Sequence, residues 1–322
     1  MNDIVTCYAP ASVGNLSVGF DLLGLAIEPI DGSYFGDRVT ICDAKTGAQA
    51  LQLSFDGQYA SALPSDPAKN VVTRSLDLFR TQLGISSFTE LSIQLTKSLP
   101  IGSGLGSSAS SIVAALTAIN HWFGDPVDKQ GLLELMSKVE SSISGEKHFD
   151  NIAPSYLGGL VLCDSLDAPP QFLSWPDSWQ IIVAYQNTQI KTKDARNVLP
   201  DSYPRNVLVK QAASLARFVH GLDSGDLELA ARNIVDLVAE PYREQLLPGF
   251  EPAKRHVLQH GALAAGISGS GPTMFAIVDN ADNANELANW LKENYAGDGF
   301  VKLCKADRTG ARQLTGVELE VH

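Results

Sequence analysis

The chain has 322 residues, of which 24 are basic and 36 acidic, and its formal net charge is −12. This length is about twice that of a usual domain and predicts two lobes, while the composition is that of a soluble globular protein. The negative charge argues against nucleic acid or an anionic membrane surface as a partner, so an anionic ligand would need local donors and a cation.

The first half of the chain predicts strands interleaved with long helices. Alternating, β-rich segments predict strands over residues 4–9, 38–42, 51–55, 91–95 and 160–163. Asn70 and Gly84 are residue types that begin and end helices, and apolar residues recur at helical spacing between them, so we expect a helix over 71–83. A second amphipathic helix is expected to start near residue 132 and to end near Ser141.

Residues 100–111 read PIGSGLGSSASS and lead into a strongly helical run over 109–123. Gly102, Gly104 and Gly106 allow the main chain to approach a ligand closely, and Ser107 opens the helix. A helix N-terminus carries unpaired N–H groups and a partial positive charge, so the segment predicts a phosphate site. A plain structural turn would need only one or two glycines.

Two familiar phosphate-binding motifs do not fit this loop. The dinucleotide fingerprint requires a third glycine, but that position is Ser107 counted from Gly102 and Ala109 counted from Gly104. A Walker A loop would end in Gly-Lys-Ser/Thr, yet no lysine lies between Lys97 and Lys129. The sequence therefore predicts a lysine-free phosphate loop in which backbone donors, a serine hydroxyl and a metal share the electrostatic work.

Residues 98–124 lack charged side chains and are long enough to span a bilayer. Their serines and glycines, together with Pro100, Asn120 and His121, argue against a membrane helix. We expect a loop followed by a buried helix.

The second half of the chain predicts another mixed lobe. Proline-rich residues 164–177 suggest a boundary that divides the chain into lobes of residues 1–165 and 166–322. A strand over 180–185, two or three helices within 205–261, and a final run of strand, glycine loop, strand, helix and strand over 263–304 are expected. Strict βα alternation is missing, which favours an α+β fold.

The four cysteines, Cys7, Cys42, Cys163 and Cys304, lie far apart in the sequence. Neither structural zinc nor a disulfide framework is expected, and the residues are interpreted as core thiols of a reducing compartment. The first ten residues contain an acid and no apolar segment, so no secretory signal is expected. A cytoplasmic location follows as the prediction, and a homodimer is the commonest oligomer for such a chain.

Two further glycine-rich segments carry candidate ligand-binding residues. In APASVGNLSVGFDLLGLA, Asn15 and Asp21 lie in a predicted loop, where they either form Asx turns or caps or bind a substrate hydroxyl or amine. GISGSGPTMFAIVD, starting at Gly266, is either a hairpin loop or one side of a cleft that encloses a nucleotide and its acceptor.

Several charged and polar residues have both a structural and a functional interpretation. Glu140 is either a solvated helix-end charge or a Mg²⁺ ligand together with a serine hydroxyl. Arg196 and Arg243 are either surface residues or a fork for a carboxylate. His148, Asp150 and Asn151 occupy a polar loop in which a catalytic residue would fit, although no spacing singles one out.

Taken together, YAPASVGNLSVGFDLLGLA, LPIGSGLGSSASSIVAAL and GISGSGPTMFAI resemble, in order and spacing, the three motifs of the GHMP kinases. Over nearly the whole length, GEKHFDNIAPSYLGG, TKDARNVLP and AEPYREQLLPGF resemble the homoserine kinase family within that superfamily. The resemblance implies an N-terminal lobe like ribosomal protein S5 domain 2, a ferredoxin-like C-terminal lobe, and an active site between them. It also implies phosphorylation of L-homoserine by ATP, the step that commits carbon to threonine.

The resemblance further implies roles for particular residues. A loop wraps the triphosphate of ATP and comprises Pro100, Ile101, Gly102, Ser103, Gly104, Leu105, Gly106, Ser107, Ser108, Ala109 and Ser110. Ser108, or else Ser107, joins Glu140 in holding Mg²⁺. The substrate and catalytic residues are Asn15, Asp21 and Asn151 near the hydroxyl and amine, Arg196 and Arg243 on the carboxylate, and Thr192 close to the reacting phosphate.

Asn151 departs from the pattern of several sugar and mevalonate kinases of the superfamily, which have an aspartate that can act as a base in this place. An amide cannot abstract a proton, but phosphoryl transfer depends mainly on positioning and charge neutralisation. Two alternatives stay open: a GHMP kinase for another small alcohol, such as mevalonate or a sugar, and a nucleotide-sensing protein without turnover.

Overall fold

A computed structural model describes residues 4–44, 51–64, 66, 69–86, 91–144, 148–164 and 168–315. Its strands are β1 (Ile4–Gly14), β2 (Leu23–Pro29), β3 (Gly36–Asp43), β4 (Gln52–Asp56), β5 (Leu91–Thr96), β6 (Leu160–Leu162), β7 (Gln171–Leu173), β8 (Gln180–Tyr185), β9 (Ala264–Ile267), β10 (Met274–Val278), β11 (Phe300–Ala306) and β12 (Arg312–Gln313).

The α-helices of the described residues are α1 (Val71–Leu83), α2 (Ser107–Trp122), α3 (Lys129–Ser144), α4 (Ile152–Leu157), α5 (Thr192–Asn197), α6 (Arg205–Ser224), α7 (Leu227–Arg232), α8 (Glu240–Arg243), α9 (Phe250–Gln259) and α10 (Ala281–Leu291). Single turns of 3-10 or π type occur at η1 (Ala60–Ala62), η3 (Glu244–Leu246) and η4 (Lys292–Ala296).

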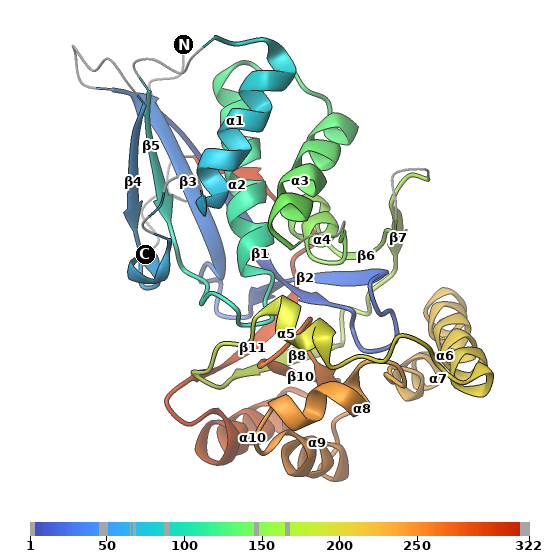
Figure 1. Ribbon diagram of the computed structural model, residues 1–322. Coiled ribbons are helices and arrows are strands. Elements are labelled where there is room, and N and C mark those ends of the chain that lie inside the picture. Colours follow the sequence, from blue (N-terminus) through green and yellow to red (C-terminus); the bar gives the residue numbers. More distant parts are fainter. Residues whose placement is uncertain are drawn as a thin grey trace.

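A single mixed sheet runs through the molecule in the order β4-β5-β3-β1-β2-β11-β8-β10-β9. Long strand β1 connects its two parts, because Ile4–Pro10 pair with β3 whereas Ala11–Gly14 pair with β2. Strand β2 then pairs with β11, from the C-terminal end of the chain. The result is the predicted two-lobed α+β architecture, in which the lobes share one sheet (Figure 1).

The N-terminal lobe is built around α2. This helix contacts β1, β3, α1, α3 and α4, and its side chains from Ala109 to Asn120 are all buried. The uncharged segment is therefore a loop and a core helix, as the sequence predicts. Within the described residues, none of the helices combines the length and apolar character that crossing a lipid bilayer would need.

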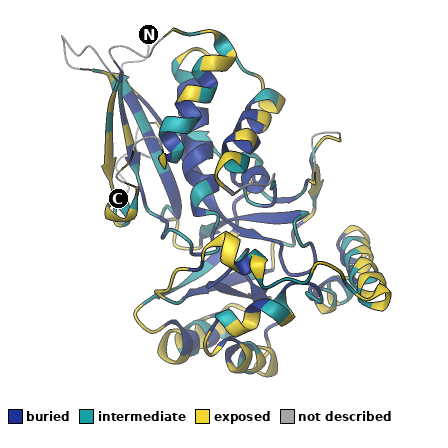
Figure 2. Ribbon diagram, in the orientation of Figure 1, coloured by how far each residue is buried: buried dark blue, intermediate teal, exposed yellow. Residues whose placement is uncertain are grey.

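The C-terminal lobe has helices on both faces of its part of the sheet. Ile182 and Ala184 of β8 pack in the cluster that includes α9 and α10, whereas Ile181 and Val183 pack in the cluster that includes α6 and α7. Successive strand residues point to opposite faces, so the two clusters lie on opposite sides of the sheet. Figure 2 shows the buried strands enclosed by helices with exposed outer faces.

Local signals in the sequence located several elements well. The side chain of Asn70 accepts a hydrogen bond from the backbone N–H of Val72 at 2.9 Å, and Gly84 ends α1 with φ of 66°. Strand β8 has the predicted bounds, and α2 begins at Ser107, two residues earlier than the expected run. The four cysteines are free thiols, and three of them are buried.

Other elements were not predicted. The segment around β2 was interpreted as a loop, and α4, α5, β7 and β12 were not identified. The predicted boundary between residues 165 and 166 lies outside the described residues. The boundary therefore stays a prediction. Strands β2 and β11, which come from opposite sides of it, are neighbours in the sheet.

Candidate active site

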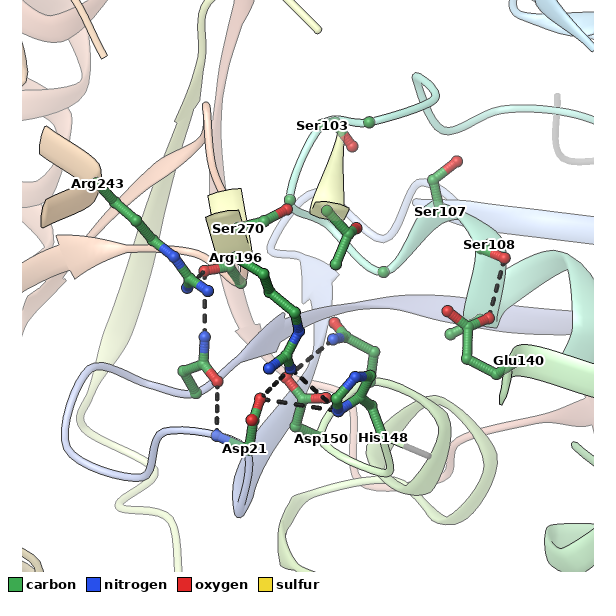
Figure 3. A pocket seen from close by; sticks show the side chains of 18 residues that line it. Asp21, Ser103, Ser107, Ser108, Glu140, His148, Asp150, Arg196, Arg243 and Ser270 are labelled. Atoms are coloured by element: carbon green, nitrogen blue, oxygen red, sulfur yellow. Dashed lines mark hydrogen bonds and ion pairs between the residues drawn. The ribbon is translucent and has the colours of Figure 1, made fainter. Parts of the chain in front are cut away.

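One cavity opens where the start of α2, the β9–β10 turn and the start of α5 meet (Figure 3). Both halves of the chain contribute to its lining, which consists of Asn15, Asp21, Gly102, Ser103, Gly104, Gly106, Ser107, Ser108, Ala109, Glu140, His148, Asp150, Asn151, Thr192, Arg196, Arg243, Gly269 and Ser270. Most of the residues that the sequence analysis proposed as nucleotide or acceptor ligands therefore line one cavity.

Residues 102–106 form a backbone cradle at the N-terminus of α2. Gly102, Gly104 and Gly106 have φ of 67°, 78° and 66°, which favours glycine strongly. A Cβ on Gly104 would lie 2.4 Å from the carbonyl oxygen of Ser268. Gly106 occupies the N-cap position, so this end of α2 has no side-chain cap. The first-turn N–H groups are thus available for an anion.

The β9–β10 turn braces this cradle. The hydroxyl of Ser268 donates to the carbonyl oxygen of Gly104 at 2.7 Å, and the backbone N–H of Thr273 donates to that of Ser103 at 3.2 Å. Gly269 of the same turn lines the cavity. The second glycine segment is therefore part of the cleft as well as a connection between strands.

Ser108 and Glu140 form a polar pair at one end of the cavity (Figure 3). The Ser108 hydroxyl donates to Oε2 of Glu140 at 3.0 Å, and the two residues come from α2 and α3. Burial raises the pKa of Glu140, and the Ser108 hydrogen bond opposes this shift. A carboxylate and a hydroxyl oxygen beside an anion cradle are suitable ligands for Mg²⁺, which prefers oxygen and usually retains few protein ligands.

The opposite end of the cavity is built from charged side chains. Nη2 of Arg196 donates to Oδ1 of Asp21 at 2.7 Å and contacts Nδ1 of His148 at 3.1 Å. Because a guanidinium can only donate, this contact makes Nδ1 the acceptor and places the proton of a neutral imidazole on Nε2. Arg196 is thereby held in one orientation by two residues from distant segments (Figure 3).

Arg243 is fixed by backbone carbonyl groups. Its side chain, only 3% exposed, donates from Nε to the oxygen of Ala195 at 3.1 Å and from Nη1 to that of Gly269 at 3.0 Å. The guanidinium groups of Arg243 and Arg196 lie 5.2 and 5.9 Å from the ring centroid of Phe20. The aromatic ring accommodates both cations at once, which keeps two positive groups beside the same cavity.

The amide of Asn151 has a defined orientation. Its Oδ1 accepts from the hydroxyl of Ser12 at 2.9 Å, and its Nδ2 donates to Oδ2 of Asp150 at 3.1 Å. Asp150 is 6% exposed, and burial raises the pKa of its carboxyl to about 7. The charge of Asp21 adds to this shift and that of Arg196 opposes it.

The segment after β1 has an unusual backbone. Asn15, Leu16 and Ser17 have φ of 65°, 44° and 56°, and Asp21 has φ of 58°. Non-glycine residues in this region cost free energy, and such residues concentrate at functional sites. The amide of Asn15 secures the turn, since its Oδ1 accepts from the N–H of Asp21 at 2.9 Å and its Nδ2 donates to the oxygen of Gly269 at 3.1 Å.

The remaining nominated residues lie at the margin of the cavity or outside its lining. Thr192 is exposed at the start of α5 and reaches the cavity edge. Pro100, Ile101, Leu105 and Ser110 belong to the same loop and helix but are not among the lining residues of the described cavity. The Ser110 hydroxyl instead donates to the carbonyl oxygen of Ala9 at 2.8 Å, in the core.

Sequence reasoning missed several contributors. Ser12 and Phe20 were not nominated, because a hydroxyl and a ring within a glycine-rich segment have no spacing signal. His148 and Asp150 were noticed only as members of a polar loop. Ser270 had a usable signal, since it lies in the glycine turn for which one side of a cleft was one of two open interpretations.

Models of the N-terminal and C-terminal domains of the GHMP kinases match residues 70–159 and 218–297. With the two-lobed fold and the glycine loop before α2, this match shows that the chain belongs to the GHMP kinases. Kinases of this family use ATP, generally with Mg²⁺.

Solved structures extend this comparison. The structure of homoserine kinase from Cytophaga hutchinsonii is 33% identical, with a TM-score of 0.87 and 98% of each chain covered. Mevalonate kinase from L. major in complex with R-mevalonate is 16% identical, with a TM-score of 0.71 over 95% of each chain. A D-glycero-D-manno-heptose 1-phosphate kinase from Bacteroides thetaiotaomicron is 17% identical, with a TM-score of 0.67 over 97% of this chain and 99% of that chain. The last two similarities concern the fold alone.

Proposed function

We propose that this chain transfers the terminal phosphoryl group of ATP to the side-chain hydroxyl of L-homoserine, forming ADP and O-phospho-L-homoserine. One observation carries the proposal: an uncapped glycine cradle and a pair of buried or half-buried arginines face each other across a single cavity. The first suits the phosphates of a nucleotide, and the second suits a carboxylate. Similarity to the Cytophaga hutchinsonii homoserine kinase supports the choice of acceptor.

The nucleotide end fits ATP and Mg²⁺ on its own chemistry. A Cβ at any of the three cradle glycines would collide with neighbouring protein atoms, so glycine is needed for this main-chain conformation, and the backbone N–H groups supply the donors. Ser108 and Glu140 would hold the metal, because their oxygen atoms adjoin the cradle and lie 3.0 Å apart. Mg²⁺ supplies neutralisation of phosphate charge when bound.

The acceptor end fits an amino acid. Arg243 and Arg196 would bind its carboxylate, since a guanidinium fork matches carboxylate geometry. Asp21 carries the negative charge suited to an ammonium group, while Asn15 fixes the backbone around it. The Asn151 amide, oriented by Ser12 and Asp150, would position the hydroxyl that attacks.

Catalysis on this proposal rests on positioning. The Asn151 side chain cannot accept the hydroxyl proton as a carboxylate would, so it orients the oxygen by hydrogen bonding. Thr192, at the cavity edge, would contact the reacting phosphate. Transfer through a loose transition state needs alignment and charge neutralisation more than a strong nucleophile, so the proton leaves late, to a phosphate oxygen.

The test is an ADP-release assay with a panel of alcohols. We expect turnover with L-homoserine and Mg²⁺, and little turnover with R-mevalonate, with hexoses, or without metal. A preference for mevalonate or a sugar would support kinase activity but contradict L-homoserine as the acceptor. Tight ATP binding without ADP release for any alcohol would point to a nucleotide sensor instead.

A further inference from the structure

Lys97 and Asp37 form the most buried ion pair among the described residues, with side-chain exposures of 2% and 0%. Asp37 lies at the start of β3, and Lys97 follows β5 at the entry to the glycine loop. The lining of the described cavity includes neither residue. A buried ion pair is weak support for stability by itself, because removing two charges from water is costly. The contacts of the ion pair therefore indicate whether it has a role besides stability.

The Asp37 carboxylate holds the beginning of the loop. Its Oδ1 accepts from the backbone N–H groups of Ser98 and Leu99 at 2.9 and 3.1 Å. Its Oδ2 accepts from the Lys97 ammonium and from the Ser111 hydroxyl. The carboxylate thus connects the strand end before the cradle to the helix after it.

The Lys97 ammonium holds the end of the loop. It donates to the carbonyl oxygen of Ser107 at 2.8 Å and to the Ser111 hydroxyl at 2.9 Å, both in the first turns of α2. With the bond to Asp37, all three ammonium protons have acceptors. Lys97, the lysine nearest in sequence to the glycine loop, is therefore buried with its ammonium group bound inside the protein, and it does not line the cavity.

The intervening residues are flexible by themselves and are held by other segments, such as the β9–β10 turn at Ser103 and Gly104. Gly102, Gly104 and Gly106 all have positive φ, and glycine has the largest backbone freedom to lose. Donor groups bind an anion well only when they are arranged before it arrives. The ion pair anchors both ends of the segment, whose middle the β9–β10 turn braces, and so contributes to this arrangement.

We infer that Lys97 and Asp37 are positioning residues for nucleotide binding, which act by clamping the two ends of the glycine loop rather than by attracting phosphate. The inference rests on the proposed binding of ATP at this loop. If Lys97 instead attracted phosphate directly, the Asp37→Asn variant would show the opposite change in nucleotide binding. Neutralising Asp37 would then leave an unopposed cation near the loop and tighten nucleotide binding.

The experiment compares Lys97→Met, Asp37→Asn and the double variant in the full chain. Asparagine keeps an acceptor for the Ser98 and Leu99 N–H groups, and the double variant leaves no lone buried charge, which limits the loss of stability. The dissociation constant of a fluorescent ATP analogue with Mg²⁺, the KM values for ATP and L-homoserine, and the thermal unfolding midpoint are measured for each.

We expect all three variants to bind the analogue about tenfold more weakly or worse, with the homoserine KM at saturating ATP unchanged. The double variant should resemble the single variants, because the pair acts as a unit. Tighter binding in Asp37→Asn, or wild-type affinity in the folded double variant, would overturn the inference. A wild-type chain that binds no ATP analogue would overturn the proposed function and this inference together, whereas ATP binding without homoserine turnover would reject the acceptor alone.

Two milder variants decide the matter if the charge variants do not fold. Ser111→Ala removes a hydroxyl that contacts both members of the pair, and Thr117→Val removes a buried hydroxyl further along the same helix. We expect weaker nucleotide binding, by about threefold, for Ser111→Ala only. Equal affinities for these two variants would contradict the clamp.

Discussion

The two ends of the cavity are constructed differently. At the proposed nucleotide end, the surface is backbone from one short segment, with glycines where a Cβ would collide with neighbouring atoms. At the proposed acceptor end, it is a set of side chains from the segment after β1, the residue before α4, and helices α5 and α8, each held by a partner from another segment. Backbone donors recognise a feature common to all nucleotides, whereas side chains define one particular acceptor. Mutations at the two ends should therefore change different kinetic parameters, those for ATP at the first and those for the acceptor at the second.

The largest effect is expected at the backbone end, from Gly104→Ala. Its Cβ would lie 2.4 Å from the oxygen of Ser268 and 2.8 Å from that of Gly271, at φ of 78°. The cradle must deform, and we expect kcat/KM for ATP to fall by at least about a hundredfold, or about 2.7 kcal/mol. Gly124→Ala is the matched control, since its φ is 79° and no atom beyond its chain neighbours lies within 4 Å of the added Cβ. Equal ATP kinetics in the two variants would contradict a backbone-built site.

A more selective effect is expected at the side-chain end, from Arg196→Met or Arg243→Met. Each charge-assisted hydrogen bond to a carboxylate contributes about 1.5–3 kcal/mol, so the homoserine KM should rise by about 10- to 150-fold with little change in that for ATP. Steady-state kinetics with homoserine and with 3-aminopropan-1-ol, which lacks the carboxylate, separate this loss from general damage.

Exposed Arg255 on α9 provides a control for loss of positive charge. Arg255→Met should leave both KM values unchanged. If an arginine variant raises the KM for the carboxylate-free alcohol as much as the KM for homoserine, that arginine acts on something other than the carboxylate.

The proposed Mg²⁺ ligands Ser108 and Glu140 adjoin the glycine cradle, and Glu140→Gln tests this proposal. Replacing the carboxylate by an amide weakens an oxygen ligand of Mg²⁺, and we expect the half-saturating Mg²⁺ concentration to rise by about tenfold. Glu134→Gln on the same helix is the control, because Glu134 is exposed and pairs with Lys138. Unchanged magnesium dependence in Glu140→Gln would remove this residue from the proposed ligands.

The same contrast explains what the sequence predicted. The glycine loop was predictable because the residues that need its conformation are close together in the sequence and come directly before a helix. The acceptor end was not predictable from spacing, since Asp21 and Arg196 are 175 residues apart and meet only through the fold. The residues alone left a structural and a functional interpretation open for both, and the family resemblance then implied their roles in the site.

Elements stabilised mainly by tertiary contacts were missed for a related reason. Helix α5 has mostly exposed side chains and only Ala195 buried, so it lacks an apolar period; it docks where the N–H of Ile190 donates to the oxygen of Gly102 at 3.1 Å. The Lys97–Asp37 pair depends on strand register, because the pairing of Arg38 with Thr96 brings the adjacent residues together. Neither fact is visible before the strands are paired.

The smallest expected effect concerns the stability cost of the acceptor end. Burial raises the pKa of Asp150 from its ordinary value of 3.8 to about 7, with a further contribution from Asp21. Between these pH values the folded chain keeps a proton that the unfolded chain has released, so the free energy of unfolding decreases as pH rises through this window. Above about pH 7 the folded carboxyl also ionises, and the decrease is complete.

Asp150→Asn removes this cost without removing the side-chain oxygen that accepts from Asn151. We expect the melting temperature of the variant, relative to the wild type, to increase by about 2 °C between pH 5 and pH 8. Asp194→Asn on exposed α5 should give the same difference at both pH values. Calorimetry at the two pH values measures this, and a relative stability of Asp150→Asn that stays constant or falls would show that the site tolerates the ionised carboxylate at no cost. In that case the buried charges at the side-chain end of the cavity would be fully compensated by their own partners, and this end would carry no stability cost that the backbone end lacks.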